Sequence, residues 1–323
     1  MHLTNDNSHP ASCTSSYTDD LFDLLYQANS VAKKHSCQAI IQLGDLFHIK
    51  TPGRNSHQLI QRTMRWASEA PCPVAVVPGN HDLLNDRLES LDEGQPLGVL
   101  YSSGIVSRAE GYLKLARGLN NFIPVYGVPW QQFWDADHSV ADQAVKAALS
   151  NFIPSDTPQL IVTHAPFFPE GINPAYEHYS VDKFSRYVNP DGKSNVQVIY
   201  GHIHDYHGEY VVNGVRFVNY GALSRGSLTE SNLTRDVGVT IWDSVTGRFE
   251  FIALQAKPAE QVFRVKEIAE VKTTQLKLDE FLKSVGQSSI EVTTISSVMD
   301  KIRSLKLGKD FENVVEELLT SAE

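Results

Sequence analysis

Four short apolar runs in this chain each end in side chains that can bind a metal ion. In chain order the endings are Gly44-Asp45-Leu46-Phe47-His48, Gly79-Asn80-His81-Asp82, Thr163-His164 and Gly201-His202-Ile203-His204. Such endings are unusual for packing alone, because histidine and carboxylate groups contribute little to an apolar core. In an open α/β sheet, ligands bind outside the carboxyl ends of the strands. The four endings therefore predict an α/β fold with one shared polar site.

The spacing of apolar residues supports this fold. Helical spacing predicts helices over 19–35, 55–70 and 137–149, and short apolar runs predict strands over 39–43, 74–77, 122–128, 160–163 and 196–200. This alternation implies parallel strands with crossover helices. We expect an insertion over 83–118 and a long polar and aromatic loop over 166–191. After His204, antiparallel hairpins are predicted at 209–220, around Asn213-Gly214, and at 237–254.

A change in composition near residue 257 predicts two parts. Residues 1–256 carry all the strand patterns and form the expected catalytic domain. Residues 257–323 are charged and helix-prone, with scattered apolar positions, and we expect them to form a small helical appendage.

Composition restricts the class of protein. With 323 residues and 41% apolar content, the chain can bury a large core without disulfides, and its three cysteines have no CxxC spacing. No apolar run approaches the roughly 20 residues of a membrane span, and the N-terminus lacks signal-peptide features. We therefore expect a cytoplasmic protein without membrane contact. The formal net charge of −10 argues against a broad basic face for nucleic acid, although metal ions in a nuclease can neutralise phosphates locally.

The ligand types indicate which metals the site takes. Imidazole, carboxylate and amide oxygen without cysteine suit Mn²⁺, Fe or Zn²⁺. There are more candidates than one ion needs, and two ions roughly 3.5–4 Å apart that share a bridging carboxylate would use them all.

These motifs resemble those of the calcineurin-like metallophosphoesterases. The family pattern is D-x-H, G-D-x-x, G-N-H-D/E, a strand-end histidine and G-H-x-H, and its last four elements occur in order over residues 44–204. The resemblance implies a four-layer α/β sandwich, with mixed β-sheets flanked by helices. The D-L-F-H sequence of residues 45–48 is more similar to SbcD-type DNA-repair nucleases.

The resemblance also implies a role for each matching residue. Asp45 would bridge two metals, Asn80 would bind one of them with His164 and His202, and His204 would bind the other with the N-terminal motif. His81 would give a proton to the leaving oxygen, and Asp82 would orient His81. His48 would lie near the substrate or a metal-bound water, or would have a structural role. Arg225 could contact a phosphate, although a structural role in its loop is favoured.

The first family motif is incomplete. His2-Leu3 matches the end of D-x-H, so His2 is a candidate ligand, and the motif's aspartate would fall before Met1, as would the strand ahead of it. We interpret this as a chain that begins inside the motif, through a misassigned start codon or a truncation. Alternatively, Asp6 or another early carboxylate substitutes.

The leading functional hypothesis is a two-metal phosphodiester hydrolase, a DNA exonuclease or endonuclease that uses Mn²⁺, with Fe or Zn²⁺ as alternatives. In that branch the appendage can bind an SbcC-like ATPase, and a homodimer is left open. A phosphatase or phosphodiesterase for a small molecule or nucleotide is a second hypothesis, because the family's substrates vary. A non-catalytic scaffold that lost a ligand is a third, and the retained His81 argues against it.

Overall fold

The computed structural model describes residues 1–113, 125–132, 134, 138–172, 174, 178–264 and 303. The chain divides into two compact units, Met1–Phe263 and Arg264–Glu323. The fold described below is that of the first unit. The predicted helical appendage over 257–323 lies, beyond Arg264, almost entirely outside the described residues.

A parallel three-stranded sheet carries the first two motifs. It consists of β1 (Ile40–Gln42), β2 (Val74–Val76) and β3 (Ser107–Arg108), in that order. Helix α1 (Tyr17–Lys34) precedes β1 and buries the stripe that its 3.6-residue periodicity predicts. Helix α2 (His57–Ser68) crosses from β1 to β2 and begins at Ser56, whose hydroxyl accepts a hydrogen bond from Leu59 N. The predicted parallel crossover is confirmed.

A six-stranded sheet carries the other two motifs. Its order is β4-β5-β6-β7-β9-β8, and β5, β6, β7 and β9 run parallel. The strand bounds are β4 (Gly111–Tyr112), β5 (Val125–Val128), β6 (Gln159–His164), β7 (Val196–Gly201), β8 (Tyr206–Val212) and β9 (Val215–Tyr220). The β8–β9 hairpin turns at Asn213-Gly214, both with positive φ, as this dipeptide predicts.

The remaining elements are short. A separate antiparallel hairpin is formed by β10 (Gly238–Asp243) and β11 (Arg248–Ala253). The other helices are α3 (Pro96–Ser102), α4 (His138–Ala148), α5 (Val181–Val188), α6 (Glu230–Thr234) and α7 (Ala259–Val262), and 3-10 turns cover Asp6–Ser8, Pro52–Arg54, Asn80–Asp82, Leu84–Asp86 and Leu88–Glu93. No described helix is both long and apolar enough to cross a membrane.

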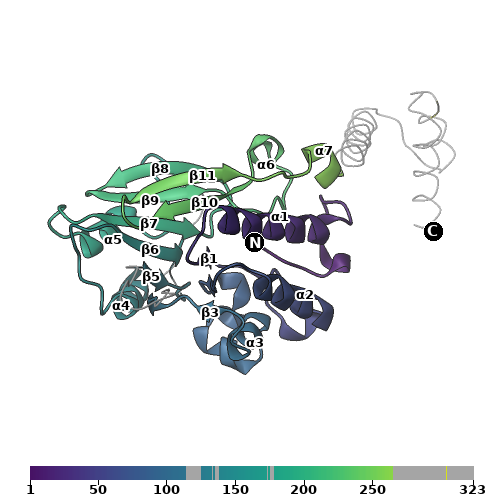
Figure 1. Ribbon diagram of the computed structural model, residues 1–323, viewed down its shortest axis with the longest axis horizontal. Coiled ribbons are helices and arrows are strands. Elements are labelled where there is room, and N and C mark those ends of the chain that lie inside the picture. The colour runs from purple at the N-terminus through teal and green to yellow at the C-terminus, as the bar shows by residue number, and fades with distance from the viewer. Residues whose placement is uncertain are drawn as a thin grey trace, which may run out of the picture. The chain divides into compact units, whose positions relative to one another are not determined.

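The predicted fold class is confirmed: the structure is a mixed α/β fold with several sheets flanked by helices (Figure 1). One prediction was wrong. The region 166–191 contains helix α5, whose Phe184 and Val188 are buried and whose N-terminus is capped by Ser180. Phe184 packs against Phe167 and Phe217. The helix is a single amphipathic stretch of eight residues, and its polar and aromatic composition hid the apolar face.

Candidate metal centre

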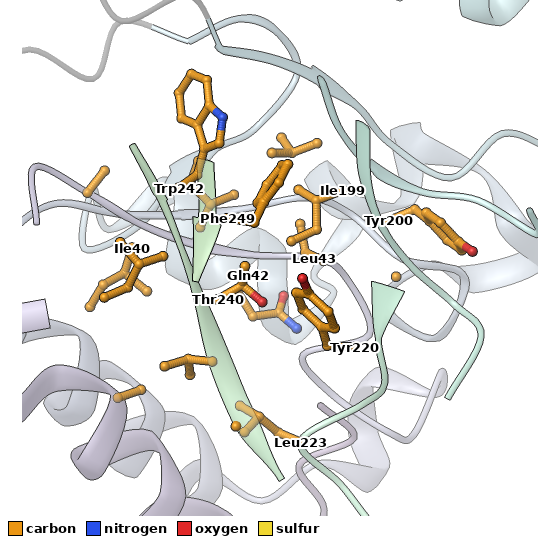
Figure 2. Close-up of a pocket in the computed structure, with 18 of the residues that line it drawn as sticks. Ile40, Gln42, Leu43, Ile199, Tyr200, Tyr220, Leu223, Thr240, Trp242 and Phe249 are labelled. Atoms are coloured by element: carbon orange, nitrogen blue, oxygen red, sulfur yellow. The ribbon is translucent and has the colours of Figure 1, made fainter. Parts of the chain in front are cut away.

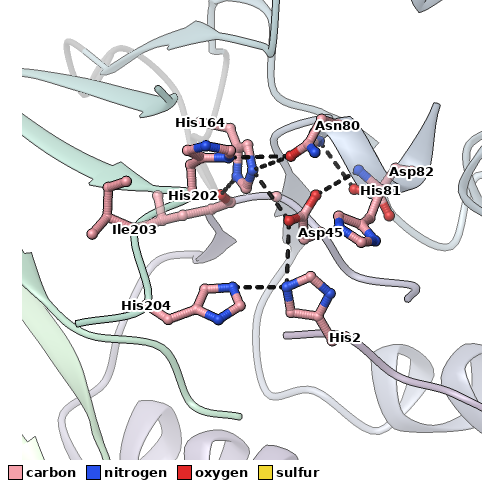
Figure 3. A network of polar contacts seen from close by, with 12 residues as sticks. His2, Asp45, Asn80, His81, Asp82, His164, His202, Ile203 and His204 are labelled. Atoms are coloured by element: carbon pink, nitrogen blue, oxygen red, sulfur yellow. Dashed lines mark hydrogen bonds and ion pairs between the residues drawn. The ribbon is translucent and has the colours of Figure 1, made fainter. Parts of the chain in front are cut away.

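The four predicted strand endings come together at one place. Asp45, Asn80, His164, His202 and His204, from both sheets, lie within one polar network, and His2 from the N-terminus joins them (Figure 3). The described residues include three groups whose potential ligand atoms all lie within 4.8 Å of one another: Asp45-His164-His202, His2-Asp45-His204 and His2-His48-His81. The strand ends predicted from the sequence are therefore the ones that meet.

Asp45 connects the two groups that contain a carboxylate. Its Oδ2 lies 3.3 Å from His164 Nε2 and 3.4 Å from His2 Nε2. Its Oδ1 accepts a hydrogen bond of 2.8 Å from the backbone N–H of His81. Gly44 and Asp45 both have positive φ, 93° and 53°, which turns the chain sharply after β1 and directs the carboxylate back over the strand end. Asp45 therefore lies between the two groups, and its role as a bridging ligand stays a prediction.

The first side of the network contains Asn80, His164 and His202. Asn80 Oδ1 lies 3.2 Å from both His164 Nε2 and His202 Nδ1. His164 Nδ1 donates to the backbone carbonyl of Leu43 at 2.7 Å, so Nε2, which faces Asn80 and Asp45, is the ring atom available to a metal. The three side chains that the resemblance assigned to one ion thus lie in contact, and their role as ligands stays a prediction.

The second side contains His2 and His204, whose Nε2 atoms lie 2.8 Å apart. His2 is buried and has a positive φ of 63°, and its backbone N–H donates to Asp45 O. Asp6, considered as a substitute carboxylate, is exposed in the Asp6–Ser8 turn and belongs to none of the three groups. Among the described residues, Asp45 is the one carboxylate in these groups.

His81 and His48 lie beside His2, in the part of the network that also contains His204. Their rings are stacked, with centroids 5.3 Å apart and an interplanar angle of 13°, and the His2 ring lies 4.6 Å from that of His81. His81 Nδ1 donates to the backbone carbonyl of His48 at 2.7 Å. This hydrogen bond fixes the ring and leaves Nε2 free for a proton transfer. His48 thus lies beside the site, as its place after D-L-F suggested.

The structure corrects the role expected of Asp82. Its buried carboxylate accepts hydrogen bonds from three backbone N–H groups, those of Leu46, Phe47 and Gly79, at 3.0–3.2 Å. It therefore joins the Asp45 loop to the Asn80 loop, and the His48 carbonyl, not Asp82, orients His81. The resemblance therefore implied a different partner: Asp82 is the third residue of a 3-10 turn, and its side chain points back to Gly79.

Burial favours the neutral form of three site histidines, His2, His202 and His204. It lowers the pKa of His202 to about 3 and that of His204 to about 4, and it holds the pKa of His2 well below the usual value. Burial raises the pKa of Asp45, but the surrounding histidines, His164 first, outweigh it and hold that pKa well below the usual range. A divalent cation requires neutral imidazoles and an ionised carboxylate, and these directions for His2, His202, His204 and Asp45 agree with that requirement.

Two glycines let the strand ends approach this closely. A Cβ at Gly79 would lie 2.2 Å from Asp45 N, and one at Gly201 would lie 2.3 Å from Leu43 O. These two motif glycines therefore allow the backbone of one strand end to pack directly against that of another, behind the candidate ligands.

Sequence reasoning missed Trp130. This buried residue follows β5, and its ring lies 4.8 Å from that of His202 and 6.1 Å from that of His164. A lone tryptophan after a strand carries no ligand signal, so no sequence pattern selects it. Arg225 is buried, and its guanidinium donates to Lys257 O at 2.5 Å; the structural role favoured for it stays a prediction.

The residues present fit divalent cations. Asp45, Asn80, His164 and His202 offer oxygen and nitrogen atoms for one ion, and Asp45, His2 and His204 offer them for another. The set has no thiolate and is mostly buried, which suits Mn²⁺, Fe or Zn²⁺.

The family model described as calcineurin-like phosphoesterase matches residues 3–206. No curated protein matches. Among solved structures, TT1561 of Thermus thermophilus is 18% identical, with a TM-score of 0.48, and the match covers 72% of this chain and 94% of that one. A second solved structure is 14% identical, with a TM-score of 0.45, and the match covers 72% and 95% of the two chains. Because the family model spans most of the chain and includes all four strand endings, this protein belongs to the calcineurin-like phosphoesterase family.

Proposed function

We propose that this protein hydrolyses phosphodiester bonds with two divalent cations, Mn²⁺ first, and that its substrate is DNA. One observation carries the two-metal part: Asp45 Oδ2 lies within 3.4 Å of both His164 and His2, so one carboxylate belongs to two ligand groups. Divalent cations held there supply Lewis-acid activation of water and neutralise the phosphoryl oxygens.

We assign to His81 the protein's own part in bond cleavage, which is the donation of a proton to the leaving oxygen. Its Nδ1–H is held by the His48 carbonyl, so a protonated ring presents its second N–H, at Nε2, to the leaving oxygen as the P–O bond breaks. Asp45 accepts the backbone N–H of His81, which fixes this proton donor relative to the ligand that joins both groups. The stacked His48 ring restricts the rotation of His81.

The choice of DNA rests on the D-L-F-H sequence of residues 45–48, which is similar to SbcD-type nucleases. The formal net charge of −10 means that DNA binding must depend on the cations rather than on a broad basic face. DNA cleavage should therefore vanish with chelator.

The test compares His81→Gln with His57→Gln, a matched change at an exposed histidine on α2. Purified proteins are incubated with MnCl₂ and single-stranded DNA, double-stranded DNA or bis-p-nitrophenyl phosphate. We expect His81→Gln to lower kcat by about 10²- to 10⁴-fold with Mn²⁺ affinity retained, and His57→Gln to match the parent.

Each other outcome rejects a specific part of the proposal. Ester hydrolysis without DNA cleavage rejects DNA as the substrate and supports a small-molecule phosphodiesterase. Equal turnover by His81→Gln and the parent rejects the proton donor. No turnover with Mn²⁺, Fe²⁺ or Zn²⁺ rejects the enzyme and supports the scaffold.

A further inference from the structure

Three histidines form a cluster without a carboxylate: His2, His48 and His81, here called the tris-histidine group. Their potential ligand atoms all lie within 4.8 Å of one another. The rings of His48 and His81 are stacked, and the His2 ring meets both edge-on, with its centroid 5.3 Å from that of His48 and 4.6 Å from that of His81. Three imidazoles from three separate segments of the chain are thus held together in one place.

The two ring nitrogens of His2 face different groups. Its Nε2 lies 2.8 Å from His204 Nε2 and 3.4 Å from Asp45 Oδ2. Its Nδ1, in contrast, lies 3.3 Å from His48 Nδ1. A cavity of about 570 Å³, part of which Figure 2 shows, is lined by His2, Asp45 and His204. Neither His48 nor His81 lines this cavity. The tris-histidine group is therefore a separate set of donors that shares the His2 ring with the candidate metal centre.

The spacing of the nitrogens fits a zinc ion. Two nitrogens bound to one tetrahedral Zn²⁺ at about 2.0–2.1 Å lie about 3.3–3.4 Å apart. His2 Nδ1 and His48 Nδ1 have this separation, 3.3 Å. His81 would supply Nε2, because its Nδ1–H is held by the His48 carbonyl. His48 and His81 are only half-buried, so the group is open to an ion from solvent.

The donor set discriminates between divalent ions. Three imidazoles without a carboxylate suit Zn²⁺, whereas Mn²⁺ prefers oxygen ligands and binds nitrogen sites more weakly than Zn²⁺ does. The oxygen donors Asp45 and Asn80 belong to the candidate metal centre and not to this group. The tris-histidine group should therefore bind Zn²⁺ at concentrations at which Mn²⁺ leaves it empty.

Zinc in this group would block the proton donor. In the proposed reaction, His81 gives a proton from Nε2 to the leaving oxygen. Zinc at Nε2 uses the same lone pair, so the ring cannot carry that proton while zinc is bound. Where His2 also holds an ion through Nε2, zinc at Nδ1 displaces the remaining ring proton to solvent.

We propose that the tris-histidine group is an inhibitory zinc site, in which His2 Nδ1, His48 Nδ1 and His81 Nε2 hold one Zn²⁺ and turnover stops. The inhibition rests on the proposed function, because it acts through the proton donor His81. The binding of zinc does not depend on that function.

The test counts bound zinc with and without His48. His48→Phe keeps an aromatic ring beside His81 but has no nitrogen, His48→Gln removes the ring, and His57→Gln is the matched control at an exposed histidine. Each protein is dialysed to equilibrium against ZnCl₂ or MnCl₂, and its metal content is measured by atomic absorption. We expect the parent and His57→Gln to bind one more equivalent of Zn²⁺ than either His48 variant. Bound Mn²⁺ should be equal in all four proteins.

Equal zinc content in the parent and both His48 variants would overturn the site. A difference of one equivalent with Mn²⁺ as well would overturn its selectivity. These counts need no turnover, so they decide the site even if the protein hydrolyses no phosphoester.

The inhibition is measured on bis-p-nitrophenyl phosphate with MnCl₂, before and after ZnCl₂ is added. We expect zinc to lower the rate of the parent by about 100-fold or more, and that of His48→Phe by less than about 3-fold relative to its own zinc-free rate. Equal fractional inhibition of the two proteins refutes the inhibitory role. A parent without turnover rejects that role together with the proposed function, and the zinc counts then stand alone.

Discussion

Replacing Gly79 with alanine tests whether close backbone packing holds the two metal-ligand loops together. The added Cβ would lie 2.2 Å from Asp45 N and 2.4 Å from Asp45 Oδ1. Gly79 has a φ of −100°, which alanine adopts freely, so the effect is purely steric. A rotamer change cannot relieve a contact with backbone, and the two loops must separate by roughly 1 Å to reach ordinary contact.

The expected cost is about 3 kcal/mol, at the upper end for overpacking, because the clash involves a backbone atom. For a unit of this size, that cost lowers Tm by roughly 6–12 °C. Mn²⁺ affinity should fall by tenfold or more, since Asp45 belongs to both carboxylate-containing groups and also accepts the His81 N–H.

Thermal melting of the metal-free protein and calorimetric titration with MnCl₂ measure the two effects separately. Gly53→Ala is the matched control, because a Cβ there meets nothing within 4 Å, and we expect its stability to change by less than about 0.5 kcal/mol. The steric reasoning fails if Gly79→Ala melts together with Gly53→Ala and binds Mn²⁺ as tightly.

Three further predictions concern protons and metal. In chelator-treated protein, His202 and His204 have folded pKa values of about 3 and 4, below the unfolded value of about 6.5, so stability should fall as pH drops from 6.5 toward 4. Each histidine contributes up to about 1.4 kcal/mol per pH unit, and Asp82, whose pKa burial raises to about 6, offsets part of this. Urea unfolding at pH 7 and pH 5 measures the difference, and equal stability would contradict the assignment. Co²⁺ should quench the Trp130 fluorescence, because its ring lies 4.8 Å from His202, and the change should disappear in Trp130→Phe but persist in Trp242→Phe. MnCl₂ at about 100 times its Kd should stabilise the fold by about 2.7 kcal/mol, and His202→Ala should reduce that gain.

Much of the site could be predicted from the sequence, because its ligands follow strands. The motif glycines, the amide, the carboxylate and the histidines each come directly after an apolar run, and parallel strands bring their carboxyl ends to one edge of each sheet. The structure then places those edges of the three-stranded and six-stranded sheets together. Local periodicity therefore identified Asp45, Asn80, His164, His202 and His204 as one group. The β8–β9 hairpin was equally local, since Asn213-Gly214 determines its own turn.

What the sequence missed depends on contacts between loops. Asp82 follows His81 in the chain, but its carboxylate turns back to three backbone N–H groups, two of them more than 30 residues away. Trp130 lies against His202 only because β5 and β7 both flank β6. Neither partner can be read from spacing, since a side chain's direction after a turn depends on how the loops pack.

The sequence by itself therefore determined which residue types meet and in what order, because those follow from strand ends and turn residues. Only the tertiary structure decided that Asp45 lies between two ligand groups and that the His48 carbonyl orients His81. Each of these features is a contact between segments that lie far apart in the chain. They arise from packing and hydrogen bonding across the core, which no local pattern encodes.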